Sequence, residues 1–166
     1  MKKLKSYIIA GIIFVSIAGT LLHFAYEFSG RNSLLGLFVP INESIWEHTK
    51  LIFFPMLIYS FYLNKNLLPD YPCINSSMIL GEISGVISII ALYYTYSGII
   101  GFNLAVIDIS IFYISVISAF YIAYKSTLFC TLNNHKTILY FSLTVLFFMF
   151  ICFSINPPKI PLFISP

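Results

Sequence analysis

The sequence predicts an all-α fold, a polytopic membrane helix bundle with about five transmembrane helices. Hydrophobic residues make up 59% of the chain and charged residues only 9%, whereas soluble domains carry roughly 25% charged residues. A spanning helix needs about 20 apolar residues, so the 166 residues allow five or six spans with short connections. We therefore expect one integral membrane domain over residues 1–166, in contact with the lipid bilayer of the plasma membrane.

The expected spans follow the apolar runs of the chain. They cover residues 7–27, 43–63, 76–96, 99–124 and 138–155. The first run continues past Ala18 and further spans follow it, which favours a retained span over the alternative of a cleaved signal peptide. Asn42 is the expected N-cap of the second span, Glu43 would lie in its first turn, and Pro55 is expected to kink it.

The later spans are separated by turn and breaker residues. Ser97-Gly98 predicts the turn between the third and fourth spans, and Pro157-Pro158 ends the fifth. In the third span, Gly81 and Gly85 belong to a stripe of small residues suited to close helix contact. This face is the expected contact with a second copy of the chain or with a membrane partner.

Positive charges predict the orientation of the bundle. Five spans divide the positive residues between the two sides of the membrane. One side has Lys2, Lys3, Lys5, Lys65, Lys125 and Lys136, and the other side has Arg31, Lys50 and Lys159. Because Lys and Arg are enriched in cytoplasmic loops, we expect the N-terminus inside and the C-terminus outside. Trp46 would then lie in the outer interfacial belt. The scattered charges do not predict nucleic-acid binding.

A polar cluster is predicted where the first two spans meet at the outer face. His23 and Glu27 are four residues apart near the end of the first span, and Glu43, Glu47 and His48 open the second. Residues at i and i+4 share a helix face, and imidazole and carboxylate groups bind divalent metals such as Zn, Mn or Fe. We therefore expect a divalent metal site, with Glu47 and His48 as candidate catalytic groups.

The same residues also have a structural interpretation. Glu43 and Glu47 could form a solvated first turn in which Glu47 pairs with Lys50. A histidine inside a span, such as His23, is often only a hydrogen-bonded packing residue. Both interpretations stay open at this point.

Two further acids fall inside expected spans. Asp108 is expected to face the bundle interior and to find a partner such as His23, Tyr26 or a hydroxyl, because an isolated acid costs at least about 2.5 kcal/mol there. Glu82 lies nearer the inner side and is expected to belong to a separate pathway or pair. The cysteines Cys73, Cys130 and Cys152 have no metal-ligand spacing, so we interpret them as ordinary apolar residues.

Several strings resemble a family of small bacterial integral membrane proteins of unknown function. The most specific string is Asn42-Glu43-Ser44-Ile45-Trp46-Glu47-His48, and looser matches are His23 to Glu27, Tyr93 to Gly98, Asp108-Ile109 and Pro157 to Phe163. The resemblance covers nearly the whole chain and implies a multi-span fold, with no assigned activity.

Three functions compete. A membrane-embedded metal-dependent hydrolase would use the polar cluster, although no HExxH string is present. A proton- or cation-coupled transporter would use His23, Asp108 and Glu82 as a relay, although no inverted repeat is evident. A scaffold or accessory subunit would need its polar residues only for packing.

Overall fold

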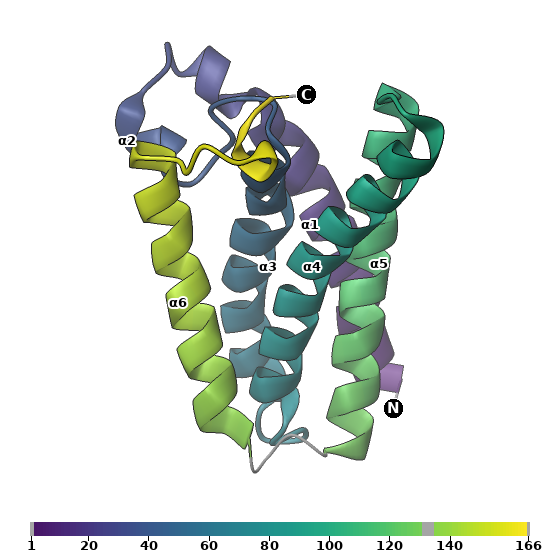
Figure 1. The fold of residues 1–166 in the computed structure, drawn as a ribbon. Coiled ribbons are helices and arrows are strands. Elements are labelled where there is room, and N and C mark those ends of the chain that lie inside the picture. Colours follow the sequence, from purple (N-terminus) through teal and green to yellow (C-terminus); the bar gives the residue numbers. More distant parts are fainter. Residues whose placement is uncertain (1, 131–134, 166) are drawn as a thin grey trace.

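The structure is a computed structural model that describes residues 2–130 and 135–165. Within these residues all regular secondary structure is helical and there is no strand. The helices are α1 (Lys2–Phe28), α2 (Ser33–Gly36), α3 (Ile45–Leu67), α4 (Ile74–Ile100), α5 (Ala105–Phe129) and α6 (Lys136–Ile155), followed by the 3-10 helix η2 (Pro161–Phe163). The long helices run side by side and the two termini lie at opposite ends of the bundle (Figure 1). The predicted all-α class is confirmed.

Four helices in the described residues are long and apolar enough to cross a membrane, namely α1, α4, α5 and α6. Their outward faces carry exposed apolar side chains such as Ile17 (58% exposed) and Ile114 (53%). In α6 only Leu139 and Phe150 are buried. Surfaces of this kind suit lipid rather than water, so the structure is consistent with a helical membrane bundle.

Helix α3 corresponds to the remaining expected span, but it differs from the other long helices. Glu47 and Lys50 lie in its first turns, and most of its residues are buried because α1 and α4 pack against it. The helix continues through Pro55. A charged pair in a central helix needs internal partners, and these partners shape the site described below.

The connection between α4 and α5 lies later than the predicted turn. Gly98 stays inside α4, and Gly101 ends the helix in the left-handed conformation, with φ 83°. Glycine adopts positive φ without strain and is the usual residue after a helix. As a result α5 begins at Ala105 rather than near Ile99, and Asp108 lies in its first turn instead of deep within the span.

Gly81 and Gly85 lie inside the bundle. A Cβ atom added at Gly81 would lie 2.5 Å from the Ala119 carbonyl oxygen, and one at Gly85 would lie 2.6 Å from Ile52 Cδ1. The two glycines therefore let α5 and α3 approach α4 closely. In this structure the Gly81/Gly85 face is covered by helices of the same chain.

Trp46 does not lie in an interfacial belt. It is only 4% exposed and packs on Phe150 and Phe163, with ring centroids 4.7 and 5.1 Å apart. The expectation of an interfacial tryptophan is wrong because α6 and η2 cover this side of α3. Trp46 instead joins the C-terminal segment to the core.

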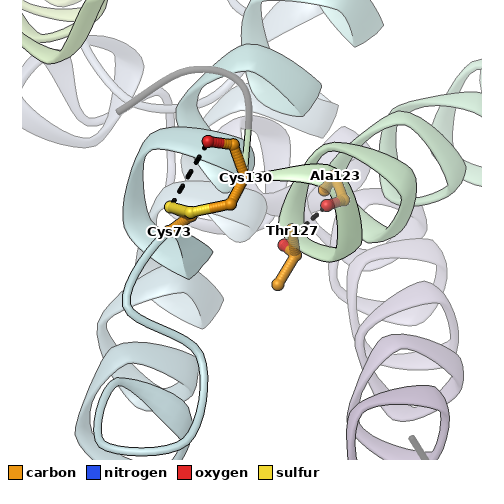
Figure 2. The surroundings of a disulfide bond; sticks show 4 residues. All are labelled: Cys73, Ala123, Thr127 and Cys130. Atoms are coloured by element: carbon orange, nitrogen blue, oxygen red, sulfur yellow. Dashed lines mark hydrogen bonds between the residues drawn. A yellow bond between two sulfur atoms is a disulfide. The ribbon is translucent and has the colours of Figure 1, made fainter. Parts of the chain in front are cut away.

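Two of the cysteines are paired, which corrects the interpretation of all three as ordinary apolar residues. A disulfide joins Cys73, just before α4, to Cys130, just after α5, with Cα atoms 5.4 Å apart (Figure 2). The antiparallel α4–α5 hairpin brings together residues separated by 57 positions. Spacing in the sequence carries no signal for such a pair. Cys152 is free and exposed.

Candidate metal centre

Three of the predicted ligands come together at the C-terminal part of α1 and the start of α3. They are His23, Glu43 and His48, and one ligand atom from each lies within 4.8 Å of the others. His48 Nε2 is 3.3 Å from Glu43 Oε2, and the two imidazole centroids are 5.3 Å apart. Two imidazoles and one carboxylate form a common ligand set for catalytic zinc.

The start of α3 explains why Glu43 reaches His48. Ser44, not Asn42, is the N-cap, because the Glu47 N–H donates to Ser44 Oγ at 3.4 Å. Asn42 instead accepts a hydrogen bond from the Ser44 N–H at 2.9 Å. Glu43 therefore precedes the helix and does not share a helical face with Glu47, which corrects the expected i, i+4 arrangement of these two residues.

The backbone orients the His48 ring. Its Nδ1 lies 2.9 Å from the Ser44 carbonyl oxygen, so the tautomer with a proton on Nδ1 donates to that oxygen. The lone pair of Nε2 then faces Glu43. A histidine that binds a metal usually donates its other N–H in this way.

His23 is half-buried in α1, and its Nδ1 is buried without a hydrogen-bond partner among the described residues. Buried polar atoms usually have a partner. The hydrogen-bonded packing role that a lone histidine often plays is thus not satisfied at this nitrogen, which leaves it available to a ligand.

A cavity of about 360 Å³ lies beside the cluster. Its walls come from α1, α3, α4 and α5 and include all three cluster residues together with Asp108. The Tyr96 hydroxyl donates to Asp108 Oδ1 and accepts from the Leu104 N–H at 3.4 Å. The partner of Asp108 is therefore a hydroxyl, one of the kinds of partner expected.

The other two predicted ligands lie elsewhere. Glu27 forms an exposed ion pair with Arg31, with 3.2 Å between Oε1 and Nε. Glu47 is buried and its Oε2 lies 2.6 Å from Lys50 Nζ. The Ile41 N–H also donates to this oxygen at 3.0 Å. Glu47 thus has the Lys50 partner of the structural interpretation, but the pair is buried rather than solvated.

The model of a family of unknown function, DUF6512, matches residues 1–165. The chain belongs to this family. No curated protein matches the chain, and no solved structure matches it. Membership in DUF6512 agrees with the resemblance to a family without an assigned activity, while the bacterial source and the importance of the Asn-Glu-Ser-x-Trp-Glu-His string stay predictions. For this DUF6512 member, the function must be argued from the chemistry of its own residues.

Glu82 lies in α4 and does not line the cavity beside the cluster. It is 1% exposed, and neither carboxylate oxygen has a hydrogen-bond partner among the described residues. The buried hydroxyls of Ser77 and Ser115 also lack a partner there. An acid in such surroundings is an unusual feature within a span.

Sequence reasoning did not assign two polar residues that matter near the site. The Tyr96 hydroxyl donates a hydrogen bond to Asp108. The sequence feature that points to Tyr96 is its position in the tyrosine-rich end of the helix before Asp108. Tyr113 lines the cavity, and its hydroxyl lies 3.1 Å from Thr20 Oγ1. The second contact joins α5 to α1 and has no signal in the sequence.

Proposed function

We propose that this protein is a membrane-embedded metal-dependent hydrolase with a divalent ion, zinc by preference, bound by His23, Glu43 and His48. The observation that supports this proposal is the approach of three ligand atoms to within 4.8 Å of one another at the wall of a cavity. Three protein ligands leave a fourth position for water or substrate, as catalytic zinc sites do. A structural site would instead be closed by a fourth protein ligand.

Each residue has a distinct role in this proposal. The ion would polarise the substrate and activate a water molecule as the nucleophile. Asp108 lines the same cavity and would accept the proton of that water, while the Tyr96 hydroxyl holds its carboxylate in place. Ser44 orients His48. The contact of Glu47 with Lys50 supports a positioning role at the start of α3, and not proton transfer.

Metal analysis of the detergent-purified protein tests the site. We expect about one ion per chain in the wild type and loss of this ion in His23→Ala, His48→Ala and Glu43→Gln. Glu27→Gln is the matched control, because it removes a nearby carboxylate that lies outside the cluster. Absence of a stoichiometric ion in the wild type, or equal loss in the control, would rule out the proposed site.

Turnover tests the reaction separately. Asp108→Asn should keep the ion and lose hydrolysis of a lipid ester, since only the proton acceptor is removed. Retained hydrolysis in this variant would remove Asp108 from the mechanism. A wild-type protein that binds the ion and hydrolyses no ester, amide or phosphoester would contradict the hydrolase.

Glu82 supports a second candidate function, a proton- or cation-coupled transporter. A fully buried carboxyl group without a partner can bind and release a proton inside a bundle. In liposomes that contain a pH-sensitive dye, Glu82→Gln and Asp108→Asn should abolish flux, whereas Glu27→Gln should not. Flux that is unchanged in Glu82→Gln, or absent in the wild type, would count against transport. Absence of metal, hydrolysis and flux together would favour a scaffold.

A further inference from the structure

The cavity beside the cluster opens between α1 and α5. Five exposed residues of its wall lie on these two helices: Thr20 and Phe24 on α1, and Ala105, Ile109 and Tyr113 on α5. The other exposed wall residue is Glu43, which precedes α3 at the polar end of the cavity. Phe24 is 51% exposed and Ile109 is 59% exposed. Ala105, Ile109 and Tyr113 are spaced by four residues, so they follow one face of α5.

This opening faces the region that lipid would occupy. Both α1 and α5 are long and apolar enough to cross a membrane, and the exposed side chains of Phe24 and Ile109 are apolar. Thr20 and Tyr113 carry the hydroxyl groups at the opening, and their two hydroxyl oxygens lie 3.1 Å apart. The exposed carboxylate of Glu43 lies at the end of the cavity near the start of α3, whereas Phe24 and Ile109 give the side between α1 and α5 an apolar rim.

The polar and apolar walls of the cavity are separated along the helix axes. Glu43, His48 and Asp108 lie at the start of α3 and in the first turn of α5. Leu51, Ile89 and Phe112 line the cavity deeper in the bundle. From Ala105 to Tyr113 the wall extends about 12 Å along α5, at 1.5 Å per residue. Such a cavity matches a molecule with a polar head and an apolar tail.

Resting on the proposed function, we infer that the substrate is a membrane lipid with a neutral or zwitterionic headgroup, which enters sideways between α1 and α5. Its headgroup ester would lie at the cluster and one acyl chain would lie along the deeper apolar wall. The acidic side chains in the lining are Glu43 and Asp108, and the lining contains no lysine or arginine. With the proposed divalent ion bound, these two carboxylates balance its charge, and the lining has no surplus positive charge to attract an anionic headgroup.

Photocrosslinking in vesicles tests this inference. The protein is reconstituted in phosphatidylcholine that contains a fraction of phosphatidylcholine with a diazirine in its acyl chain, and the labelled residues are mapped by mass spectrometry after irradiation. We expect labels on Leu51, Ile89 or Phe112. Ile109→Trp, which fills the opening, should reduce these labels several-fold.

Ile117→Trp is the matched control, because Ile117 lies two turns further along the same face of α5, is 53% exposed and does not line the cavity. It should leave the labels unchanged. Labels confined to outward residues such as Ile114, or cavity labels that persist in Ile109→Trp, would overturn the inference.

Metal content is measured on the same vesicles, so the two proposals can fail separately. Bound metal without cavity labels contradicts the lipid substrate and leaves the metal site in place. Cavity labels without bound metal contradict the proposed hydrolase and, with it, the role of the lipid as substrate. A parallel sample with anionic phosphatidylglycerol carrying the same diazirine chain tests the headgroup preference, and equal labelling by both lipids would overturn that preference.

Discussion

Lys50 is a fully buried lysine whose ammonium group is surrounded by acceptors. Its Nζ lies 2.6 Å from Glu47 Oε2 and donates to the Gly36 carbonyl at 3.0 Å and to Ser154 Oγ at 2.6 Å. The pair thereby connects the segment before α3, α3 itself and α6. Burial of two charges has a large desolvation cost, so removal of one partner should be far more disruptive than removal of both.

Lys50→Met should lower the free energy of unfolding by about 3–5 kcal/mol, because Glu47 would remain buried without its cation. The double variant Glu47→Gln with Lys50→Met should recover part of this loss. Lys3→Ala is the control, since Lys3 forms only a half-exposed pair with Asp70 at 2.7 Å and exposed pairs contribute about 0–1 kcal/mol. Unfolding in detergent, followed by circular dichroism, measures the differences. Equal losses for Lys50→Met and Lys3→Ala would refute a structural role for the buried pair.

Of the five metal ligands predicted from the sequence, the structure brings three together. His23, Glu43 and His48 lie together, but Glu27 and Glu47 have cationic partners of their own. The grouping of Glu43 with Glu47 assumed a helix that is capped by Asn42 and begins at Glu43. The actual cap at Ser44 moves Glu43 off the helix, and two residues of difference in a helix boundary are enough to redirect a carboxylate.

In α4, a glycine at a helix contact and a glycine on an open surface occur in the same helix. Gly81 lies against the Ala119 backbone of α5, while Gly98 in the same helix has nothing within 4 Å of an added Cβ atom. The two positions therefore separate the effect of helix contact from that of helix propensity. A methyl group at the first site meets backbone atoms, which cannot rotate away.

Gly81→Ala should destabilise the bundle by about 1–3 kcal/mol, because the added methyl group must push α4 away from α5. Gly98→Ala should stabilise it by up to about 1 kcal/mol, since alanine loses less backbone entropy in a helix. Thermal unfolding of both variants in the same detergent gives the comparison. If the two substitutions shift stability in the same direction, the close α4–α5 contact is not what Gly81 provides.

The hydropathy of the chain predicted the existence of every long helix but located their ends less well. Each expected span overlaps one of α1, α3, α4, α5 and α6. The turn expected at Ser97-Gly98 lies inside α4, because glycine is tolerated in a helix and only the positive φ of Gly101 stops it. Apolar content reports burial in lipid or protein, whereas a helix end depends on the backbone conformation of one residue.

For the molecule as a whole, the lysine-rich segments and the disulfide lie at the same end. Lys3 contacts Asp70 in the connection between α3 and α4, and Cys73 in that connection is bonded to Cys130 at the end of α5. The positive-inside rule predicts that this end faces the cytoplasm. Cytoplasmic thiols are kept reduced, whereas disulfides persist on the oxidising side of a membrane. The charge pattern and the disulfide thus give opposite expectations for the same face, and the redox state of the pair in cells can decide the orientation.

If the N-terminus is inside, Cys73 and Cys130 should be thiols in living cells and should form their disulfide only after lysis in air. Cells are quenched with acid, and the denatured protein is alkylated with a large maleimide reagent before and after chemical reduction. With the pair reduced in the cell, alkylation adds three groups to Cys73, Cys130 and Cys152 in both samples, and with the pair oxidised it adds one group, at Cys152, until reduction. The variant Cys73→Ser with Cys130→Ser, which keeps only Cys152, marks the mobility of a singly labelled chain.

An alkaline phosphatase fused to the C-terminus should be active in the same cells, because the termini lie at opposite ends (Figure 1). One label before reduction, together with an inactive phosphatase, would reverse the orientation and place the candidate metal centre on the cytoplasmic side.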